Sequence, residues 1–392
     1  MTAIASTFDL DPAEDAAVRE AQDFASQVIA PNAEAWNLAG RVPTEAYAEA
    51  ARRGLCKLIV PQALGGLGLG VRGMAAVMEA LAAECLATAF SLVVHNNLAG
   101  AIARGGSEAQ RAAWLPGLMR GTRIGAFLLT EPQGGSDAAA ITTHATRTAD
   151  GWVLEGEKAW VSNAAQAGLL SVYAQTDASQ GWRGIASFLV DPETAGISRS
   201  APYALLGGHA LGTGGFRFEG CRIPELALQA APGAAFKAAM SGIDLARVNV
   251  AAMCCGMLRR SLEAALQAAG RRSAFGQPVL GFQGIQWMLA EAATDLAAAQ
   301  SLTARACAWL DTPARAAQAP LAAAHAKKFS TRVALARIAD CMQVMGAPGL
   351  RTDQPLARHL AGAKIAQYLD GTTEIQNVVI SRRLASQFEP QA

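Results

Sequence analysis

The sequence contains few charged residues and no cluster of basic ones. Charged residues make up only 17% of the 392 residues, whereas roughly 25% is typical of soluble domains. Hydrophobic residues make up 52%, and the net charge is +1. Because no run of Lys and Arg with interleaved aromatic residues occurs, we expect no nucleic-acid partner. The surplus of apolar residues indicates that an oligomer or a large bound cofactor covers part of the surface.

Signals for export, membrane insertion and metal binding are also missing. The segment from Met1 to Asp15 carries four acidic residues and no apolar core, which excludes a secretory signal. We find no uninterrupted apolar stretch long enough to cross a bilayer. The seven cysteines form no Cys-x-x-Cys pair, and their odd number fits reduced, buried thiols. We therefore expect a soluble cytoplasmic protein without a membrane or metal partner.

Periodicity and composition divide the chain into three units. Residues 1–122 are Ala-rich with helical patterns, residues 123–232 gather β-branched and aromatic residues in short runs, and residues 233–392 return to long helical patterns. The clearest of these repeats apolar residues at three- and four-residue steps from Ile285 to Leu310. The sequence predicts a mostly α fold with a central β domain, and a bundle of long helices that packs against another subunit.

Two features of the central unit give local predictions. Residues 124–129 are apolar throughout and predict a buried strand. The runs 152–154 and 158–161 flank Glu155-Gly156-Glu157, an arrangement that predicts a hairpin.

One glycine-rich run matches the spelling of a dinucleotide-binding loop. Gly68, Gly70 and Gly73 have the Gly-x-Gly-x-x-Gly spacing. However, Pro61 and several loop residues separate them from the preceding apolar segment, and helical sequence follows in place of a second strand that ends in an acidic residue. We interpret the run as a loop between helices and not as a nicotinamide site.

Two stretches of the central unit carry residues suited to a planar cofactor. Thr130–Asp137 follows the predicted strand and offers N–H groups and hydroxyls that suit a polar ring or a phosphate. Its Pro and paired Gly are also typical of a structural turn, which is the simpler interpretation from chemistry alone. Trp160–Asn163 ends a predicted strand, where the indole could cover one face of an aromatic cofactor or pack in the core.

Two further stretches lie at helix ends. Arg271–Gly276 closes a predicted helix; its guanidinium groups suit a pyrophosphate and Phe275 suits stacking on a purine, but basic residues there also complement the helix dipole. Tyr368–Gln376 lies between two helical segments and contains Asp370-Gly371, a common turn dipeptide. For Asp370 alone, a turn is the simpler interpretation than catalysis.

Taken together in this order, these stretches resemble the acyl-CoA dehydrogenase family over nearly the whole chain. The matching stretches are Pro61–Gly70, Thr130–Asp137, Trp160–Asn163, Leu206–Pro224, Arg272–Gly276 and Gly371–Gln376. The resemblance implies an N-terminal helical domain, a β-barrel-like middle domain and a C-terminal four-helix bundle. It also implies FAD as cofactor, an acyl-CoA or acyl-carrier substrate, an electron-transfer flavoprotein as electron acceptor, and a homo-oligomer, usually a tetramer.

The resemblance further implies which residues bind FAD. Those that match positions around the flavin ring and ribityl chain are Phe127, Leu129, Thr130, Ser136, Trp160 and Ser162. Those that match positions around the pyrophosphate and adenine, several of them acting across the subunit interface, are Arg272, Phe275, Gln283, Gln343, Gly346, Thr372 and Glu374.

By the same resemblance, the reaction removes two hydrogens from adjacent carbons of an acyl thioester. A carboxylate takes the proton next to the carbonyl while flavin N5 accepts hydride from the next carbon, and the base's own backbone N–H helps to bind the carbonyl oxygen. Asp370 occupies the position of the base. The residues that match positions near the thioester and its pantetheine arm are Ser136, Asp244, Arg247 and Gly371.

The chain departs from the family pattern at the base itself. The family's usual base is glutamate, and the alternative position used by some relatives holds Ala246 here, so Asp370 is the only carboxylate at either place. An aspartate is shorter by one carbon–carbon bond, about 1.5 Å, and a displacement near 1 Å can cost about a hundredfold in rate. Asn377, His209 and Gln133 also replace the family's usual residues, so the substrate need not be an ordinary fatty acyl-CoA.

Two alternatives therefore stay open. One is a flavin oxidase of the same fold that acts on a nitroalkane-type substrate or a carrier-bound acyl group, because nitroalkane oxidases share the fold and use an aspartate base. The other is a flavin-binding protein in which the shortened base is a relic.

Overall fold

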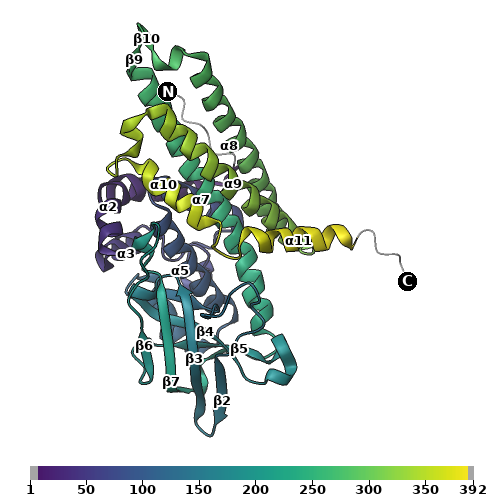
Figure 1. Cartoon of the computed structure of the whole chain (residues 1–392). Coiled ribbons are helices and arrows are strands. Elements are labelled where there is room, and N and C mark those ends of the chain that lie inside the picture. Colours follow the sequence, from purple (N-terminus) through teal and green to yellow (C-terminus); the bar gives the residue numbers. More distant parts are fainter. Residues whose placement is uncertain (1–7, 387–392) are drawn as a thin grey trace.

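The computed structural model describes residues 8–386 and shows a sheet at one end, a bundle of long helices at the other, and a group of shorter helices packed against both (Figure 1). The predicted first and third units also include residues 1–7 and 387–392, which lie outside the described residues. The predicted mostly α fold with a central β domain and a helical C-terminal domain is confirmed.

The first part of the chain consists of helices. They are α1 (Pro12–Phe24), α2 (Ala30–Ala39), α3 (Thr44–Arg52), α4 (Val71–Ala82), α5 (Leu86–Gly105) and α6 (Glu108–Met119). Two of them begin with a capping box: Asp11 with Glu14 opens α1, and Ser107 with Gln110 opens α6.

The glycine-rich run 68–73 lies between helices, as the sequence predicted. Gly70 precedes α4, and the first N–H groups of that helix are already occupied. Val71 N and Arg72 N donate to the Asp311 carboxylate at 3.0 Å and 3.3 Å. This carboxylate takes the place that a phosphate would need at the helix N-terminus.

The middle of the chain forms one sheet. Its strands are β1 (Ile124–Leu128), β2 (His144–Thr148), β3 (Gly151–Val161), β4 (Ala167–Gln175), β5 (Ile185–Val190), β6 (Ile197–Arg199), β7 (Gly214–Pro224) and β8 (Leu228–Ala230). The order is β6-β7-β3-β2-β4-β5-β8, and β1 pairs with β4 in parallel. The predicted buried strand is therefore found, as β1, and its Cα partners on β4 include Leu128↔Val172.

The predicted hairpin around Gly156 is wrong, because residues 151–161 form one continuous strand, β3. Gly156 has φ +131° and a register shift against β7 lies between Leu154 and Gly156. The glycine therefore marks a bulge within a strand, which is the other common use of glycine in a β pattern.

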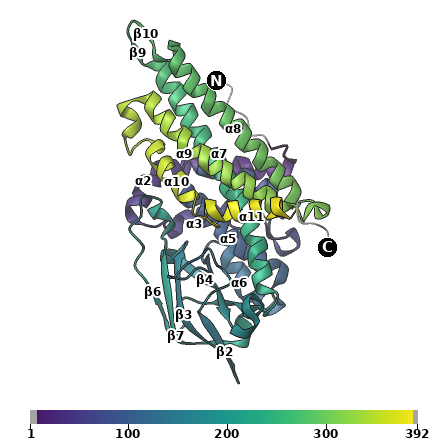
Figure 2. The same cartoon turned by 45° about the vertical axis from the view of Figure 1, so that its right-hand side comes forward.

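The last part of the chain returns to long helices. They are α7 (Ala235–Arg271), α8 (Gln283–Leu310), α9 (Ala319–Met345), α10 (Pro355–Ala366) and α11 (Thr373–Ala385), with a two-stranded ribbon of β9 (Ser273–Ala274) and β10 (Gln277–Pro278) after α7. In both views α7 runs from beside the sheet into the bundle, and α11 leaves the bundle near its base (Figures 1 and 2).

Two helices, α5 and α7, are long and apolar enough by length and composition to cross a membrane, contrary to the expectation from the sequence. Within the protein, 83% of the apolar window of α5 and 61% of that of α7 are buried. Burial of this extent is what the core helices of a globular protein show, so their apolar composition is explained by packing.

The first helical unit and the bundle meet at a glycine. A Cβ atom on Gly256 of α7 would lie 2.1 Å from the backbone oxygen of Glu79 on α4. Only a residue without a side chain lets the two helices approach this closely, and a helix backbone cannot move locally as a flexible side chain can.

We therefore expect Gly256→Ala to destabilise the protein by about 1–3 kcal/mol, because the added methyl group pushes α4 and α7 apart. Gly270→Ala on the same helix is the matched control. In the described part of the chain nothing lies within 4 Å of a Cβ at residue 270, so this change should stabilise the helix by about 0.5–1 kcal/mol. Urea unfolding midpoints of both variants check this, and equal midpoints would show that α4 and α7 adjust without strain.

Candidate active site

The ends of β1 and β3 bring together several residues predicted to surround a flavin ring. Phe127 and Thr130 are half-buried and Leu129 is buried. Ala159 N of β3 donates to Thr130 O at 3.0 Å, which joins the two strand ends. Trp160 follows with φ +57° and 58% of its surface exposed, and its ring lies 4.9 Å from that of Tyr203. A large indole held in an unfavourable backbone conformation and left uncovered indicates a binding surface.

The loop after β1 is held in place by a buried ion pair. Lys158 Nζ lies 2.8 Å from Glu131 Oε1, and the two side chains are 0% and 1% exposed. The same ammonium donates to Leu129 O at 3.0 Å, while Thr142 N and Thr143 N donate to the carboxylate at 2.7 Å and 2.8 Å. These contacts fix the loop that carries Thr130.

Glu131 and Lys158 each favour the ionised form of the other. Burial by itself raises the pKa of Glu131, but Lys158 and the threonine donors outweigh burial and lower the pKa to about 2. Burial lowers the pKa of Lys158 to about 8, although Glu131 opposes the shift. The sequence motifs do not indicate this ion pair; the only signal is a lysine, Lys158, within an apolar strand pattern.

The start of α7 connects the strand ends with a second group of predicted residues. Ala235 and Ala239 of α7 belong to one apolar cluster with Leu129 and Tyr173, and Phe127 and Ile243 pack against this cluster. Asp244 and Arg247 follow immediately on α7. Arg247 Nη1 donates to Asp244 Oδ1 at 2.7 Å, and Arg247 Nε donates to Asp370 O at 3.0 Å.

Asp370 lies in the short loop between α10 and α11. Its φ of +52° is left-handed, and Gly371 follows with φ +94°. Aspartate is among the few residues other than glycine that adopt this conformation readily, so the backbone here suits aspartate better than glutamate. Thr372 then caps α11 by accepting from Ile375 N at 3.4 Å.

The Asp370 side chain is half-buried, and its carboxylate oxygen Oδ2 is buried. Among residues 8–386, no donor reaches its Oδ2. Burial raises the pKa of Asp370 to about 6, and the nearby Lys327 and Arg247 limit the rise. A carboxylate with a raised pKa and a free oxygen has the properties of a general base near neutral pH.

Of the residues predicted for the pyrophosphate and adenine, Arg272, Phe275 and Gly346 lie together at the far end of the bundle, whereas Thr372 and Glu374 follow Asp370 at the start of α11. Arg272 Nη1 donates to Met345 O at 3.2 Å, and a Cβ on Gly346 would lie 2.6 Å from that nitrogen. Phe275, on the β9–β10 ribbon, has φ +49° and is 97% exposed. Figure 1 shows this ribbon at the opposite end of the molecule from the sheet. One chain alone does not bring this group to the strand ends.

The remaining predicted residues lie at the surface or at element ends. Gln283 begins α8, Gln343 is exposed near the end of α9, and Glu374 is exposed in the first turn of α11. Ser136 is exposed in the loop after β1, and Ser162 is half-buried after β3. Residues 8–386 contain no group of three or more His, Cys, Asp or Glu side chains that could hold a metal ion.

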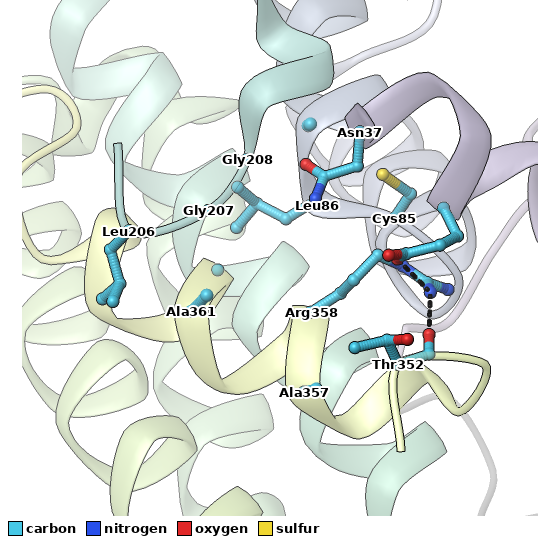
Figure 3. A pocket seen from close by; sticks show the side chains of 13 residues that line it. Asn37, Cys85, Leu86, Leu206, Gly207, Gly208, Thr352, Ala357, Arg358 and Ala361 are labelled. Atoms are coloured by element: carbon cyan, nitrogen blue, oxygen red, sulfur yellow. Dashed lines mark hydrogen bonds and ion pairs between the residues drawn. The ribbon is translucent and has the colours of Figure 1, made fainter. Parts of the chain in front are cut away.

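A cavity of about 180 Å³ lies between α2, the start of α5, the loop 206–208 and α10. Figure 3 shows Arg358 and Thr352 at one side of it and Leu206 and Ala361 at the other. None of the predicted site residues lines this cavity. It is therefore distinct from the Asp370 site.

Comparison with known proteins identifies relatives over almost the entire chain. The acyl-CoA dehydrogenase N-terminal, middle and C-terminal domain families match residues 11–122, 126–221 and 233–385. The short-chain specific acyl-CoA dehydrogenase of Sus scrofa mitochondria is 36% identical over 373 residues, covering 94% of this chain and 89% of the relative.

Solved structures give the same result. Butyryl-CoA dehydrogenase from Megasphaera elsdenii superposes with a TM-score of 0.91 at 30% identity, covering 96% of this chain and 99% of the other. A glutaryl-CoA dehydrogenase from Mycobacterium smegmatis, solved in complex with FADH2, has a TM-score of 0.88 at 26% identity, covering 96% and 95%.

The Glu131–Lys158 pair gives a test of how the site is held. We expect Lys158→Met to destabilise the protein by about 3–5 kcal/mol, because Glu131 is left as a buried charge without its partner. The double variant Glu131→Gln/Lys158→Met removes both charges and should recover part of the loss. Unfolding midpoints in urea measure both. A single variant as stable as the parent would show that the pair does not hold the loop.

Proposed function

The chain belongs to the acyl-CoA dehydrogenase family, an FAD-dependent group of enzymes that act on CH–CH bonds, and we propose that in this member Asp370 is the catalytic base for a short-chain acyl-CoA. Asp370 Oδ2 takes the proton from the carbon next to the thioester carbonyl, and the backbone N–H of Asp370 donates to the carbonyl oxygen. The shorter carboxylate in the position of the usual glutamate is the feature that distinguishes this chain.

The observation that carries the proposal is the buried carboxylate oxygen without a donor. In the described part of the chain, Asp370 Oδ2 has no hydrogen bond, although Arg247 holds the carbonyl of the same residue at 3.0 Å. A backbone that is fixed while Oδ2 stays free is the arrangement that proton abstraction needs, because the base must be oriented but available.

The residues around the strand ends fit a flavin. Phe127 and Trp160 offer an aromatic surface next to the polar loop that begins at Thr130, with Leu129 buried behind it, and the Trp160 indole is 58% exposed. When bound, FAD supplies the acceptor for the two electrons that leave the CH–CH unit. We propose that Thr130, Ser136 and Ser162 provide hydroxyl groups to its polar edge and ribityl chain.

The second group of residues fits the other end of the cofactor. Arg272 offers a guanidinium group suited to a pyrophosphate, and the 97% exposed Phe275 offers an aromatic face. We propose that Gln283, Gln343, Gly346, Thr372 and Glu374 complete this region in an oligomer in which the group of one subunit serves the flavin of its neighbour. The homotetramer remains part of this proposal.

The substrate and its setting are also proposals. A short acyl group is supported by the names of the similar proteins, a short-chain specific and a butyryl-CoA dehydrogenase. Asp244, Arg247, Gly371 and Ser136 are proposed to lie along the thioester and its pantetheine arm. We propose an electron-transfer flavoprotein as the electron acceptor, and a cytoplasmic location, which the seven buried free cysteines support.

The residue at position 370 favours a second candidate. The chain has aspartate there, and nitroalkane oxidases, which share the fold, use an aspartate base, so an oxidase for a nitroalkane-type or carrier-bound substrate is the alternative function. Oxygen consumption with peroxide formation, faster than electron transfer to an artificial acceptor, would favour the oxidase.

We expect butyryl-CoA to bleach the flavin of the purified protein under anaerobic conditions, and Asp370→Asn to slow this reduction by about 10²–10⁴-fold, because the amide cannot accept the proton. Stopped-flow absorbance measures the rate. The variant should remain yellow, since residue 370 is not proposed to hold the flavin.

Asp370→Glu is the matched control, because it keeps the charge and lengthens the side chain by about 1.5 Å. It should retain measurable reduction, unlike Asp370→Asn. If neither the parent protein nor Asp370→Glu is reduced by any of a panel of acyl-CoA substrates, the proposed activity is wrong. Equal rates for the parent and Asp370→Asn would mark Asp370 as a relic.

The raised pKa of Asp370 gives a pH dependence. The base acts only when ionised, and burial places its pKa at about 6, so kcat/KM should rise as pH increases through about 6 and level off above it. Steady-state rates with butyryl-CoA and a dye acceptor measure this profile. A limb near pH 4, the ordinary range of an exposed carboxylate, would contradict burial of the base.

A further inference from the structure

The loop that carries Asp370 is held at its carbonyl groups by side chains from three helices. Lys327 Nζ of α9 donates to Gln367 O at 3.0 Å and also to Gly371 O. Arg247 Nε of α7 donates to Asp370 O at 3.0 Å. Gln376 Nε2 of α11 donates to Gly371 O at 3.0 Å. The bonds from Lys327 reach both sides of Asp370 and fix the left-handed turn between them.

Lys327 is unusual because it is fully buried with its charge directed at neutral groups. Its side chain is 0% exposed, and burial lowers its pKa to about 8. A buried ammonium is unfavourable unless it is well bonded and lies near a negative charge. The carbonyl groups of Gln367 and Gly371 provide the bonds, and the Asp370 carboxylate provides the nearby negative charge.

Several charged or titratable groups lie near Lys327 and Asp370. They are Arg247, Asp244 and Cys254 of α7 and Glu374 of α11. Arg247 is already paired with Asp244 at 2.7 Å, which reduces its effect on Asp370. Of the two cations that lower the pKa of Asp370, Lys327 has the larger effect.

We propose that Lys327 is a positioning residue for the reaction, which holds the 367–371 loop through two carbonyl groups and keeps the Asp370 carboxylate in its anionic form. This inference rests on the proposed role of Asp370 as base. The proposed role explains how a buried Asp370 carboxylate stays ionised at neutral pH. It also explains why a lysine occupies the buried face of α9.

The test separates the charge of Lys327 from its hydrogen bonds. Lys327→Met removes both, and Lys327→Gln removes the charge but keeps an N–H donor. Lys328→Met is the matched control, the same substitution at the next position of α9. The rate of anaerobic flavin reduction by butyryl-CoA is measured for each holoenzyme between about pH 5 and pH 9, together with FAD content.

We expect the acidic limb of both Lys327 variants to move about one to three pH units higher, because an opposite charge close to a carboxylate lowers its pKa by about that amount. A limb that moves by one pH unit lowers the rate below it about tenfold. The rate of flavin reduction should therefore fall strongly at pH 6 and should return to the parent value at alkaline pH. Lys328→Met should keep the parent profile.

A second readout does not depend on turnover. The infrared band of the protonated Asp370 carboxyl group, identified by its loss in Asp370→Asn, should titrate at higher pH in Lys327→Gln than in the parent holoenzyme. A loss of rate that is equal at every pH, with the band titrating as in the parent, overturns the proposal and leaves Lys327 as a fold residue. Failure of both Lys327 variants to fold overturns it as well.

The outcome can be told apart from failure of the proposed function. If the parent is not reduced by acyl-CoA, or Asp370→Asn is reduced as fast as the parent, the role of Asp370 is wrong. If the parent is active and depends on Asp370, the Lys327 variants bear only on positioning.

Discussion

The site depends on one constraint: a carboxylate must be buried without being neutralised or fully bonded. Asp370 meets it because its backbone is held, by Arg247 at its carbonyl and by Lys327 at the carbonyls on either side, while its Oδ2 accepts no bond from residues 8–386. Burial raises the pKa and the two cations limit the rise. The left-handed backbone at residue 370, which aspartate adopts more readily than most residues other than glycine, is maintained by these same contacts.

Helix α7 connects this carboxylate with the strand ends. The long helix α7 packs its first turns against Leu129 and Tyr173 of the sheet and then presents Arg247 to Asp370. Close packing of α4 on α7 at Gly256 and the buried Glu131–Lys158 pair fix the two sides of this junction. The aromatic and basic residues around Arg272 and Phe275 lie far from it along the bundle, which is why we propose that a second subunit supplies that half of the cofactor site.

Much of this could be predicted from the sequence, because periodicity reports which face of a helix or strand is buried. The strand before Thr130 and the long helices α8 and α9 follow from such patterns. The hairpin at Gly156 was wrongly predicted, since a glycine between two apolar runs fits a bulge as well as a turn. The roles of Lys158 and Lys327 were missed because their partners are distant in sequence, and for Lys327 they are backbone carbonyls. A motif shows residue types and cannot show such contacts.

The most direct test of Asp370 as base separates proton removal from oxidation. Acetyl-CoA has a carbon next to its carbonyl but no further carbon to oxidise, so any reaction is proton exchange alone. Incubated in D2O with the holoenzyme and followed by NMR, acetyl-CoA should exchange its methyl protons for deuterium, and Asp370→Asn should abolish the enzyme-dependent part. Exchange that is equally fast in Asp370→Asn would contradict the account, because another group would then be the base.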